Sequence, residues 1–273
     1  MERYKEIERD IITKYRKSIW RKFIKANKEF KFVNKGDKIA VCISGGKDSM
    51  LLAKCMQEFQ KHNDINFEVI YLVMDPGYSE ENRQKIIDNA KLLNIPINIF
   101  DTEIFRSVEH IEDHPCYICA RMRRGYLYRK AKEFGCNKIA LGHHFDDVLE
   151  TILMNIFYGA EFKTMMPKLH STSVPGMELI RPLYFVKEAD IIKWRDRNNL
   201  DFLKCACKIT QRNAMFVDGS KRYEMKQLLK QLRKNYSNVD MCIYNSTKNV
   251  NLNTVISYIK DGEKFNFMDK FDS

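Results

Sequence analysis

Residues 44–49 form one short stretch, Ser-Gly-Gly-Lys-Asp-Ser, whose side chains could bind phosphate and a metal ion. The apolar run 39–43 before it predicts a buried strand, and the apolar spacing after Met50 predicts a helix, so the stretch is the turn between them. Its glycines let the backbone approach an anion, and the N–H groups that begin a helix attract negative charge. The residues therefore predict a phosphate-binding loop.

Asp48 distinguishes this turn from the Walker A loop, which needs a longer glycine arc and a hydroxyl directly after its lysine. A carboxylate beside bound phosphate is repelled unless a divalent cation such as Mg²⁺ lies between them. We therefore expect Asp48 to hold Mg²⁺ and Lys47 to neutralise phosphate. The alternative is a glycine turn that carries a solvated charge pair.

A second polar cluster, Gly-His-His-Phe-Asp-Asp, follows a later apolar strand. Gly142 permits a sharp turn, and Asp146 and Asp147 fall at the start of the next helix, where carboxylates are favoured. Such side chains could hold Mg²⁺ or orient a substrate; alternatively they only cap the helix. We expect a nucleotide site lined by Gly142, His143 and Asp147, with Met74 from the end of another predicted strand.

Four of the eight cysteines have spacings typical of metal ligands. Cys116 and Cys119 form a C-x-x-C at a helix entry, and Cys205 and Cys207 form a C-x-C downstream. Four thiolates suit Zn²⁺, but three ligands that hold an iron–sulfur cluster with one open iron carry equal weight, because C-x-C is narrower than the usual zinc spacing. A thioredoxin-like redox pair is disfavoured, because the C-x-x-C does not follow the first strand of a βα unit. The other cysteines are expected to be structural: Cys42, Cys55, Cys136 and Cys242.

Two sets of basic residues are candidates for binding RNA: Arg121, Arg123 and Arg124 in one, and Lys226 and Lys230 in the other. The arginines stand beside tyrosines, which combines charge for phosphates with rings for base stacking. The lysines belong to a basic stripe with four-residue steps on a predicted helix. Each set has an alternative to RNA binding. Tyrosines in a helix usually belong to the core, and a run of charged residues usually forms a solvated helix face.

The elements that must position these residues alternate as strand and helix. Four apolar runs separated by helical patterns predict an α/β fold with a doubly wound parallel sheet, with one further short strand near Leu179. Because ligands bind at the carboxyl ends of such strands, residues 44–49, 74–77 and 142–147 should surround one crevice. We expect an N-terminal basic helix in residues 1–35, a phosphate-loop domain with the cysteines in 36–215, and a helical region in 216–273.

The composition favours an acidic partner. The chain has 273 residues, and Lys and Arg exceed Asp and Glu by 11, with a pI near 9.1. Nucleic acid is the commonest acidic partner of such a protein, although a lysine-rich proteome gives the same balance. No apolar run is long enough for a transmembrane helix, and the N-terminus lacks a signal-peptide pattern, which predicts a cytoplasmic protein.

Taken in order, the segments SGGKDS, CYICARMRRGYLY, KIALGHHFDDVLETILMNIFYG, MMPKL, IRPL and KCAC resemble the PP-loop ATP pyrophosphatase superfamily. More narrowly, they are similar to its tRNA 2-thiocytidine synthetase (TtcA) group, over roughly residues 20–255. The resemblance implies an enzyme that adenylates a carbonyl oxygen with ATP and Mg²⁺, then lets sulfur displace AMP. It also implies a [4Fe-4S] cluster held by three cysteines, a tRNA substrate and a homodimer.

The resemblance also implies roles for individual residues. The ATP and Mg²⁺ site falls to Ser44, Gly45, Gly46, Lys47, Asp48 and Ser49, with Lys47 and Asp48 as the catalytic pair. The cluster ligands are Cys116, Cys119 and Cys205. Cys207 stays an alternative, because this chain has C-x-C where the group has C-x-x-C. The sulfur donor, either a cysteine desulfurase system or sulfide, is not indicated by the sequence.

Three rival functions remain open at this point. Lysidine synthetase shares the phosphate loop and the His/Asp block but has no need of the cysteines. A 2-thiouridine-forming relative would carry zinc-finger cysteines at its termini, which are missing here. A non-catalytic metal–cysteine RNA-binding redox sensor would leave residues 44–49 without a role.

Overall fold

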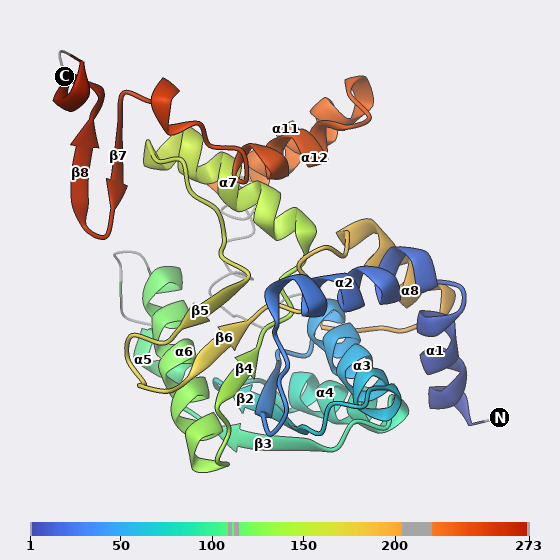
Figure 1. The fold of residues 1–273 in the computed structure, drawn as a ribbon. Helices are drawn as coiled ribbons and strands as arrows, with labels where there is room; N and C mark the ends of the chain where they lie inside the picture. The colour runs from blue at the N-terminus through green and yellow to red at the C-terminus, as the bar shows by residue number, and fades with distance from the viewer. Residues whose placement is uncertain (1, 109–110, 112–114, 204–219, 272–273) are drawn as a thin grey trace.

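The computed structural model describes residues 2–108, 111, 115–203 and 220–271, and its centre is a six-stranded sheet (Figure 1). The strand order is β3-β2-β1-β4-β6-β5. The strands are β1 (Lys38–Ile43), β2 (Glu68–Asp75), β3 (Ile97–Asp101), β4 (Lys138–Ala140), β5 (Lys168–His170) and β6 (Glu178–Ile180). All pairs are parallel except β5 with β6. The predicted parallel sheet and the strand near Leu179 are confirmed, while β5 was not foreseen.

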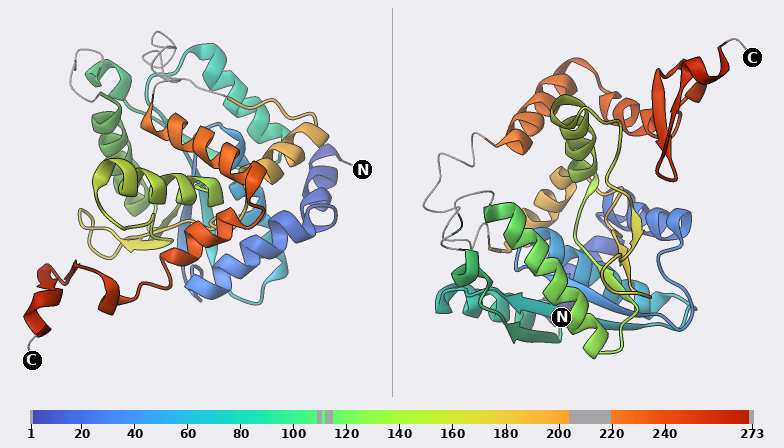
Figure 2. Two further views of the ribbon diagram at one scale, coloured as in Figure 1. Left: turned by 90° about the horizontal axis from the view of Figure 1, so that it is seen from above. Right: turned by 90° about the vertical axis from the view of Figure 1, so that its left-hand side faces the viewer.

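Both faces of this sheet are covered, as a doubly wound fold requires. Successive residues of β1 enter different cores: Ile39, Val41 and Ile43 join one cluster, whereas Ala40 and Cys42 join another. A strand buried on both faces reads as a continuous apolar run, which is why residues 39–43 show no alternation. The first cluster includes α3 (Lys47–His62), α4 (Glu80–Leu92) and α8 (Glu188–Arg197). The second packs against α6 (Pro115–Glu133), which lies beside α5 (Ile104–Val108) on the other face (Figure 2).

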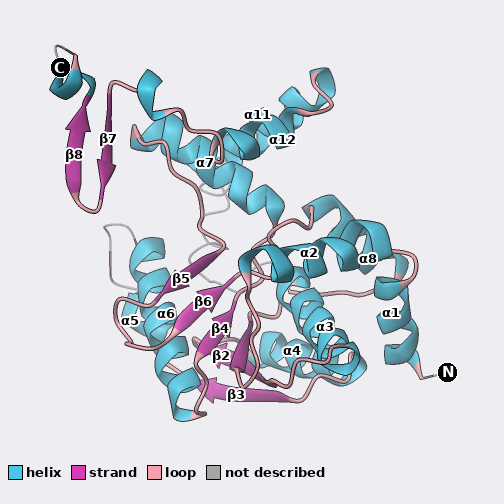
Figure 3. Cartoon of the chain, viewed as in Figure 1, coloured by secondary structure: helices cyan, strands magenta, loops and turns pink. Residues whose placement is uncertain are grey.

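The N-terminal part is not the single helix that the sequence predicted over residues 3 to about 28. It consists of α1 (Arg3–Ile12), a π-helical turn η1 (Arg16–Trp20) and α2 (Arg21–Phe30) (Figure 3). Thr13 explains the break, because its hydroxyl donates to the Arg9 carbonyl at 2.6 Å, a contact that bends helices. Ile11 is fully buried in α1, whereas Ile12 is only partly buried.

The C-terminal part begins with two helices that pack on α7 (Phe145–Gly159), namely α11 (Lys221–Asn235) and α12 (Val239–Ser246). Met225 and Leu229, four residues apart, form the buried face of α11. Beyond η2 (Leu252–Thr254), a hairpin of β7 (Ser257–Lys260) and β8 (Glu263–Asn266) leads to η3 (Phe267–Lys270). Helix was expected there; instead Asp261 and Gly262, both at positive φ, form the Asp-Gly turn typical of hairpins.

None of the helices in the described ranges has the length and apolar character that a membrane span requires.

Candidate active site at the phosphate loop

The phosphate loop presents bare backbone N–H groups at the start of α3. Gly45 has a φ of +83°, and a side chain there would meet Ile86 at 2.7 Å, so only glycine fits. The Ser49 hydroxyl accepts from the Ser44 N–H at 3.2 Å and donates to the Gly46 carbonyl at 2.9 Å, which closes the loop on itself. Gly46 occupies the N-cap position, so no side chain caps the helix. This end of α3 is therefore available to an anion.

Gly142 is needed for close packing and not for the sharp turn that the sequence suggested. A Cβ at Gly142 would lie 3.0 Å from the Ser49 nitrogen and 3.1 Å from the Asp48 carbonyl carbon. The segment after β4 is thus pressed against the first turn of α3. This contact explains how two motifs about a hundred residues apart in sequence share one site.

Asp147 has the capping role that the sequence left open. Its N–H donates to His144 Nδ1 at 3.3 Å, and its carboxylate accepts from the His144 N–H at 2.9 Å, so the two residues form a capping box for α7. Asp147 nevertheless also faces the cavity described next, so capping accounts for only part of its surroundings.

A cavity of about 610 Å³ opens between the phosphate loop, α6 and the ends of β4 and β6. It is lined by most of the predicted nucleotide site together with two predicted RNA-binding arginines: Ser44, Asp48, Ser49, Gly142, His143, Asp147, Arg123 and Arg124. Gly46 and Lys47 line a neighbouring hollow on the α8 side of the loop. Met74 is instead buried in an apolar cluster with Ile104 and Val108, and its contact with nucleotide stays a prediction.

Asp48 enters the cavity with an unsatisfied oxygen. Its Oδ2 lies 3.1 Å from Lys47 Nζ, whereas its buried Oδ1 has no hydrogen-bond partner in the described structure, with His144 Nε2 at 3.8 Å. Burial raises the pKa of Asp48, and His144 and Lys47 offset this only in part. No three His, Cys, Asp or Glu side chains of the described residues converge on a metal site. One carboxylate oxygen suits Mg²⁺ that arrives with nucleotide phosphates, because Mg²⁺ commonly takes one or two protein carboxylates.

Arg181 is the cavity residue that the sequence analysis missed. It follows β6 directly, is only 8% exposed, and donates from Nη1 to the Met166 carbonyl, while its Nε is buried without a partner. No carboxylate of the described residues pairs with it. Burial lowers the pKa of Arg181 to about 10, so the group stays charged at neutral pH. A buried cation without a counter-charge is costly, which marks Arg181 as a site for an anion.

His143 adds a neutral imidazole to the same wall. Its Nδ1 is buried without a hydrogen-bond partner in the described structure. Burial, followed by the nearby charge of Arg181, lowers the pKa of His143 to about 4. The ring is therefore uncharged at neutral pH, with one nitrogen as donor and the other as acceptor.

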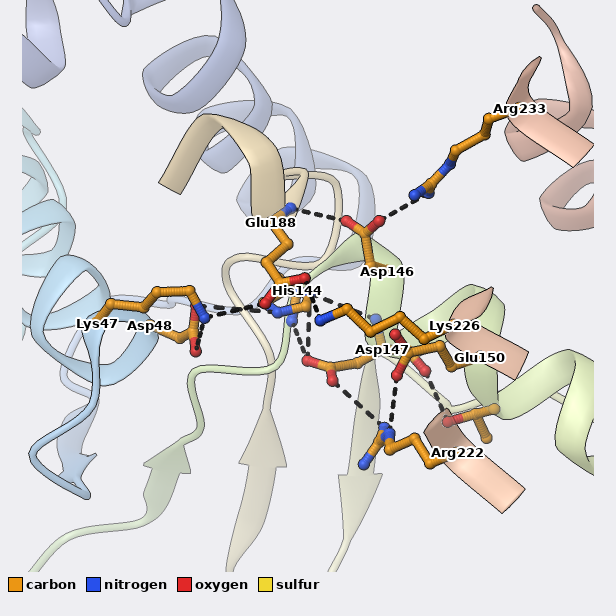
Figure 4. A network of polar contacts seen from close by, with 11 residues as sticks. Lys47, Asp48, His144, Asp146, Asp147, Glu150, Glu188, Arg222, Lys226 and Arg233 are labelled. Atoms are coloured by element: carbon orange, nitrogen blue, oxygen red, sulfur yellow. Dashed lines mark hydrogen bonds and ion pairs between the residues drawn. The ribbon is translucent and has the colours of Figure 1, made fainter. Parts of the chain in front are cut away.

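The α8 side of the phosphate loop, in contrast, carries a network of ion pairs (Figure 4). Glu188 lies between two lysines, with Lys47 Nζ at 3.1 Å and Lys226 Nζ at 2.6 Å. Burial opposes ionisation of Glu188, but Lys226 and Lys47 outweigh it and lower its pKa to about 2. Lys226 was predicted to bind RNA; here it holds an internal carboxylate, and its RNA contact stays a prediction. Lys230, one turn later, is exposed.

Two arginines of α11 extend this network to α7. Arg233 bonds both Asp146, at 2.7 Å, and Asp240, at 2.8 Å. Asp146 also accepts from the Glu188 N–H at 2.7 Å, which ties the start of α8 to α7. Arg222 lies 2.8 Å from Glu150 and 3.3 Å from Asp147. These contacts hold the C-terminal helices against the phosphate-loop domain.

The cysteines are placed only in part. Cys116 and Cys119 belong to the first turns of α6, and Cys119 packs beside the cluster of Met74. Cys205 and Cys207 lie outside the described residues. Of the cysteines expected to be structural, Cys42, Cys55 and Cys136 are buried as predicted, while Cys242 is exposed. Burial raises the pKa of the Cys42 thiol to about 12, which keeps it unreactive.

Comparisons with known proteins agree with this geometry. Residues 16–213 match the PP-loop domain family. The tRNA-cytidine(32) 2-sulfurtransferase of Neisseria meningitidis serogroup C is 35% identical over 245 residues, covering 88% of this chain and 72% of the relative. The Paraburkholderia phytofirmans protein of the same name is also 35% identical, with 88% and 69% covered.

A structural comparison supports the fold. The U34-tRNA thiolase NcsA from Methanococcus maripaludis, solved with its [4Fe-4S] cluster, superposes with a TM-score of 0.64 at 20% identity, covering 84% of this chain and 76% of that one. The phosphate loop, the glycine that packs on it and the match over most of the sequence lead to one conclusion: the chain belongs to the PP-loop family.

Proposed function

We propose that this protein is an ATP-dependent tRNA sulfurtransferase that adenylates the C2 carbonyl oxygen of a cytidine in the anticodon loop and replaces it with sulfur. The names of the relatives, which specify cytidine 32 of tRNA, support the substrate. The observation that carries the proposal is the 610 Å³ cavity, where the phosphate loop, Asp48 and Arg181 meet the helix of the C-x-x-C.

The first step activates a poor electrophile. The C2 oxygen attacks the α-phosphorus of ATP, the bond to pyrophosphate breaks, and AMP becomes a leaving group on C2. Bare N–H groups at the start of α3, with Lys47, are placed to stabilise the departing pyrophosphate. Asp48 would hold Mg²⁺ with its unsatisfied oxygen, and the ion, when bound, supplies charge neutralisation on the phosphates.

Arg181 and Arg124 face the same cavity from opposite elements and supply positive charge away from Lys47. Charge on the α-phosphate grows as the C2 oxygen attacks, and preorganised cations in a site shielded from water stabilise such charge strongly. His143, held neutral, can donate or accept one hydrogen bond at the base without adding charge.

Sulfur delivery is assigned to the cysteines. We propose that Cys116, Cys119 and Cys205 hold a [4Fe-4S] cluster, with Cys207 as the alternative third ligand. When bound, the cluster supplies sulfur to C2 through its open iron. Its position on α6, the helix that also contributes Arg123 and Arg124, would bring sulfur to the same cavity.

The proposal extends to the partners. Arg121, Arg123, Arg124, Lys226 and Lys230 are proposed to contact the tRNA. The sulfur comes from a cysteine desulfurase system or from sulfide, and a cytoplasmic homodimer is the expected form.

Mass spectrometry of tRNA nucleosides from a strain that lacks the gene tests the function. We expect 2-thiocytidine to disappear and to return with a plasmid copy. Loss of lysidine or of a 2-thiouridine would instead assign the chain to one of the rival activities. An unchanged nucleoside profile would overturn the tRNA assignment.

A further inference from the structure

The segment 14–28, here called the basic segment, carries seven cations and no acid. The segment covers η1, most of α2 and the two residues before η1. Its cations are Lys14, Arg16, Lys17, Arg21, Lys22, Lys25 and Lys28, and all but Lys22 are exposed. In α1, by comparison, two cations are paired: Arg3 lies 2.9 Å from Glu6, and Lys5 lies 2.8 Å from Glu2.

No carboxylate of the described residues pairs with the basic segment, and the two acids that flank it are engaged elsewhere. Asp10 pairs with Arg197 at 2.9 Å, and Glu29 pairs with Lys248 at 2.7 Å. Seven like charges over about four helical turns repel one another, so this arrangement costs stability unless an external anion compensates it. An ordinary solvated helix face would mix both signs, as α1 does.

Three cations of the basic segment form a regular row on α2, here called the α2 stripe. Arg21, Lys25 and Lys28 follow at steps of four and three residues, so they share one face, opposite the buried Phe23 and Ala26. The ten residues of α2 span about 15 Å. Its fixed geometry lowers the ordering cost of binding a regular row of phosphates.

The basic segment lies near the ion-pair network on the α8 side of the phosphate loop. Phe30, at the end of α2, packs against Tyr184 and Phe185, with ring centroids 5.4 and 5.5 Å apart, and Lys25 Nζ lies 5.0 Å from the Phe185 ring centre. Phe185 lies three residues before Glu188, the partner of Lys47. Lys22 also feels the charges of Lys187, Asp146 and Asp240, which belong to the ion-pair network. Figure 1 shows α2 beside α8, on the side of the molecule that α11 and α12 overhang.

We propose that the basic segment docks the phosphate backbone of the helical stem of the RNA whose loop occupies the cavity. This inference rests on the proposed function, because a loop base that enters the cavity leaves its stem outside, against a neighbouring surface. Lys and Arg contacts to phosphates release counterions and fix the register of the RNA without reading its sequence.

The test compares two triple variants with the same change of charge. Arg21→Gln/Lys25→Gln/Lys28→Gln removes the α2 stripe, and Lys91→Gln/Lys132→Gln/Lys260→Gln removes three exposed lysines elsewhere. Binding of purified tRNA is measured over a salt series, with ATP affinity as an internal check. For the stripe variant we expect tRNA binding to weaken by about 10- to 100-fold near 0.15 M salt, and the slope of log K against log salt to become shallower by about 2 to 3. The control variant should keep wild-type binding.

A short RNA limited to the single-stranded loop sequence sharpens the test, because it lacks the stem and should bind wild type and stripe variant equally. A milder variant, Arg21→Gln/Lys28→Gln, leaves the Lys25 contact with Phe185 intact and is used if the triple variant melts at a lower temperature. Equal weakening in stripe and control variants, or unchanged tRNA binding in the stripe variant, would overturn the proposal. If the wild type binds tRNA but thiolates none, the proposed function fails, while the salt series still decides whether this surface docks the stem.

Discussion

The two sides of the phosphate loop differ in how their charges are satisfied. On the α8 side, Lys226 pairs with Glu188, and Arg233 pairs with Asp146 and Asp240. Lys47 lies between the two sides, because it contacts both Glu188 and Asp48. On the cavity side, Arg181 is buried without a carboxylate partner, and one oxygen of Asp48 is buried without a hydrogen-bond partner, among the described residues. We call these the paired side and the open side.

This difference separates residues that hold the structure from residues that meet substrate. A satisfied ion pair contributes little to binding a ligand, because its charges are already compensated, but breaking it leaves a buried charge behind. A buried charge without a partner lowers stability and is retained where a ligand completes it. The comparison therefore predicts opposite outcomes for similar substitutions on the two sides.

The largest effect is expected at Asp48, where both sides meet. Asp48→Asn keeps the size of the side chain but removes the charge that would hold Mg²⁺, so we expect tRNA thiolation to fall by about 1,000-fold or more. Thiolated nucleoside is quantified with purified protein, and the exposed Asp88→Asn serves as the control. Activity within a few-fold of wild type in Asp48→Asn would remove this residue from the mechanism.

Arg233→Met tests the paired side. It leaves Asp146 and Asp240, both buried, without their shared partner, and should lower the free energy of unfolding by about 3 kcal/mol. Arg233→Lys, which keeps one charge, should lose less. Denaturant unfolding measures both. A stability equal to that of the wild type would mean that this network does not hold α11 in place.

Arg181→Met tests the open side. It removes a buried cation that has no counter-charge, so stability should stay unchanged or rise, while kcat/KM for thiolation should fall by about 100-fold. Arg181→Lys retains the charge and should recover part of the activity. If Arg181→Met unfolds as easily as Arg233→Met, the distinction between the two sides is wrong.

His143 should give the smallest effect, visible in the pH dependence of stability. Its pKa is about 4 in the folded protein, below the ordinary value of 6.5, so the unfolded chain binds the extra proton between these pH values. Above about pH 6.5 the ring is neutral in both states, so His143 does not lower the free energy of unfolding. As the pH falls from there toward 4, only the unfolded chain takes up the proton, and the free energy of unfolding decreases. Between these pH values the free energy of unfolding of the wild type should fall by on the order of 1 to 3 kcal/mol more than that of His143→Gln. Parallel pH profiles of the two proteins would show that the ring is not held neutral.

Local features of this molecule could be predicted from the sequence. Residues 44–49 combine strand end, glycines and helix start within a few positions, so their role depends little on distant contacts. The same holds for Ser79, a typical helix-capping residue, which caps α4 by accepting from the Asn82 N–H at 3.3 Å. The hairpin turn at Asp261 and Gly262 could also have been predicted, because Asp-Gly is a typical hairpin signal, but helix was expected there.

The role of Arg181 could not be predicted from the sequence, because it depends on the burial of this side chain in the cavity wall. The short β6 places it beside the end of β4, and the Met166 carbonyl that it bonds lies in the segment before β5. An arginine in a loop of unknown burial gives no sign of such a contact. Likewise, only the structure shows that Lys226 faces Glu188 and that Gly142 packs on α3.

The most direct test of the proposed chemistry is the nucleotide balance of the reaction. Anaerobically purified protein, reconstituted with iron and sulfide, is incubated with tRNA, sulfide, Mg²⁺ and ATP, and both nucleotides and nucleosides are quantified. Adenylation of the base predicts one AMP and one pyrophosphate for each 2-thiocytidine formed, with no ADP. Thiolated cytidine accompanied by ADP and phosphate, or AMP release without any thiolated base, would contradict the account.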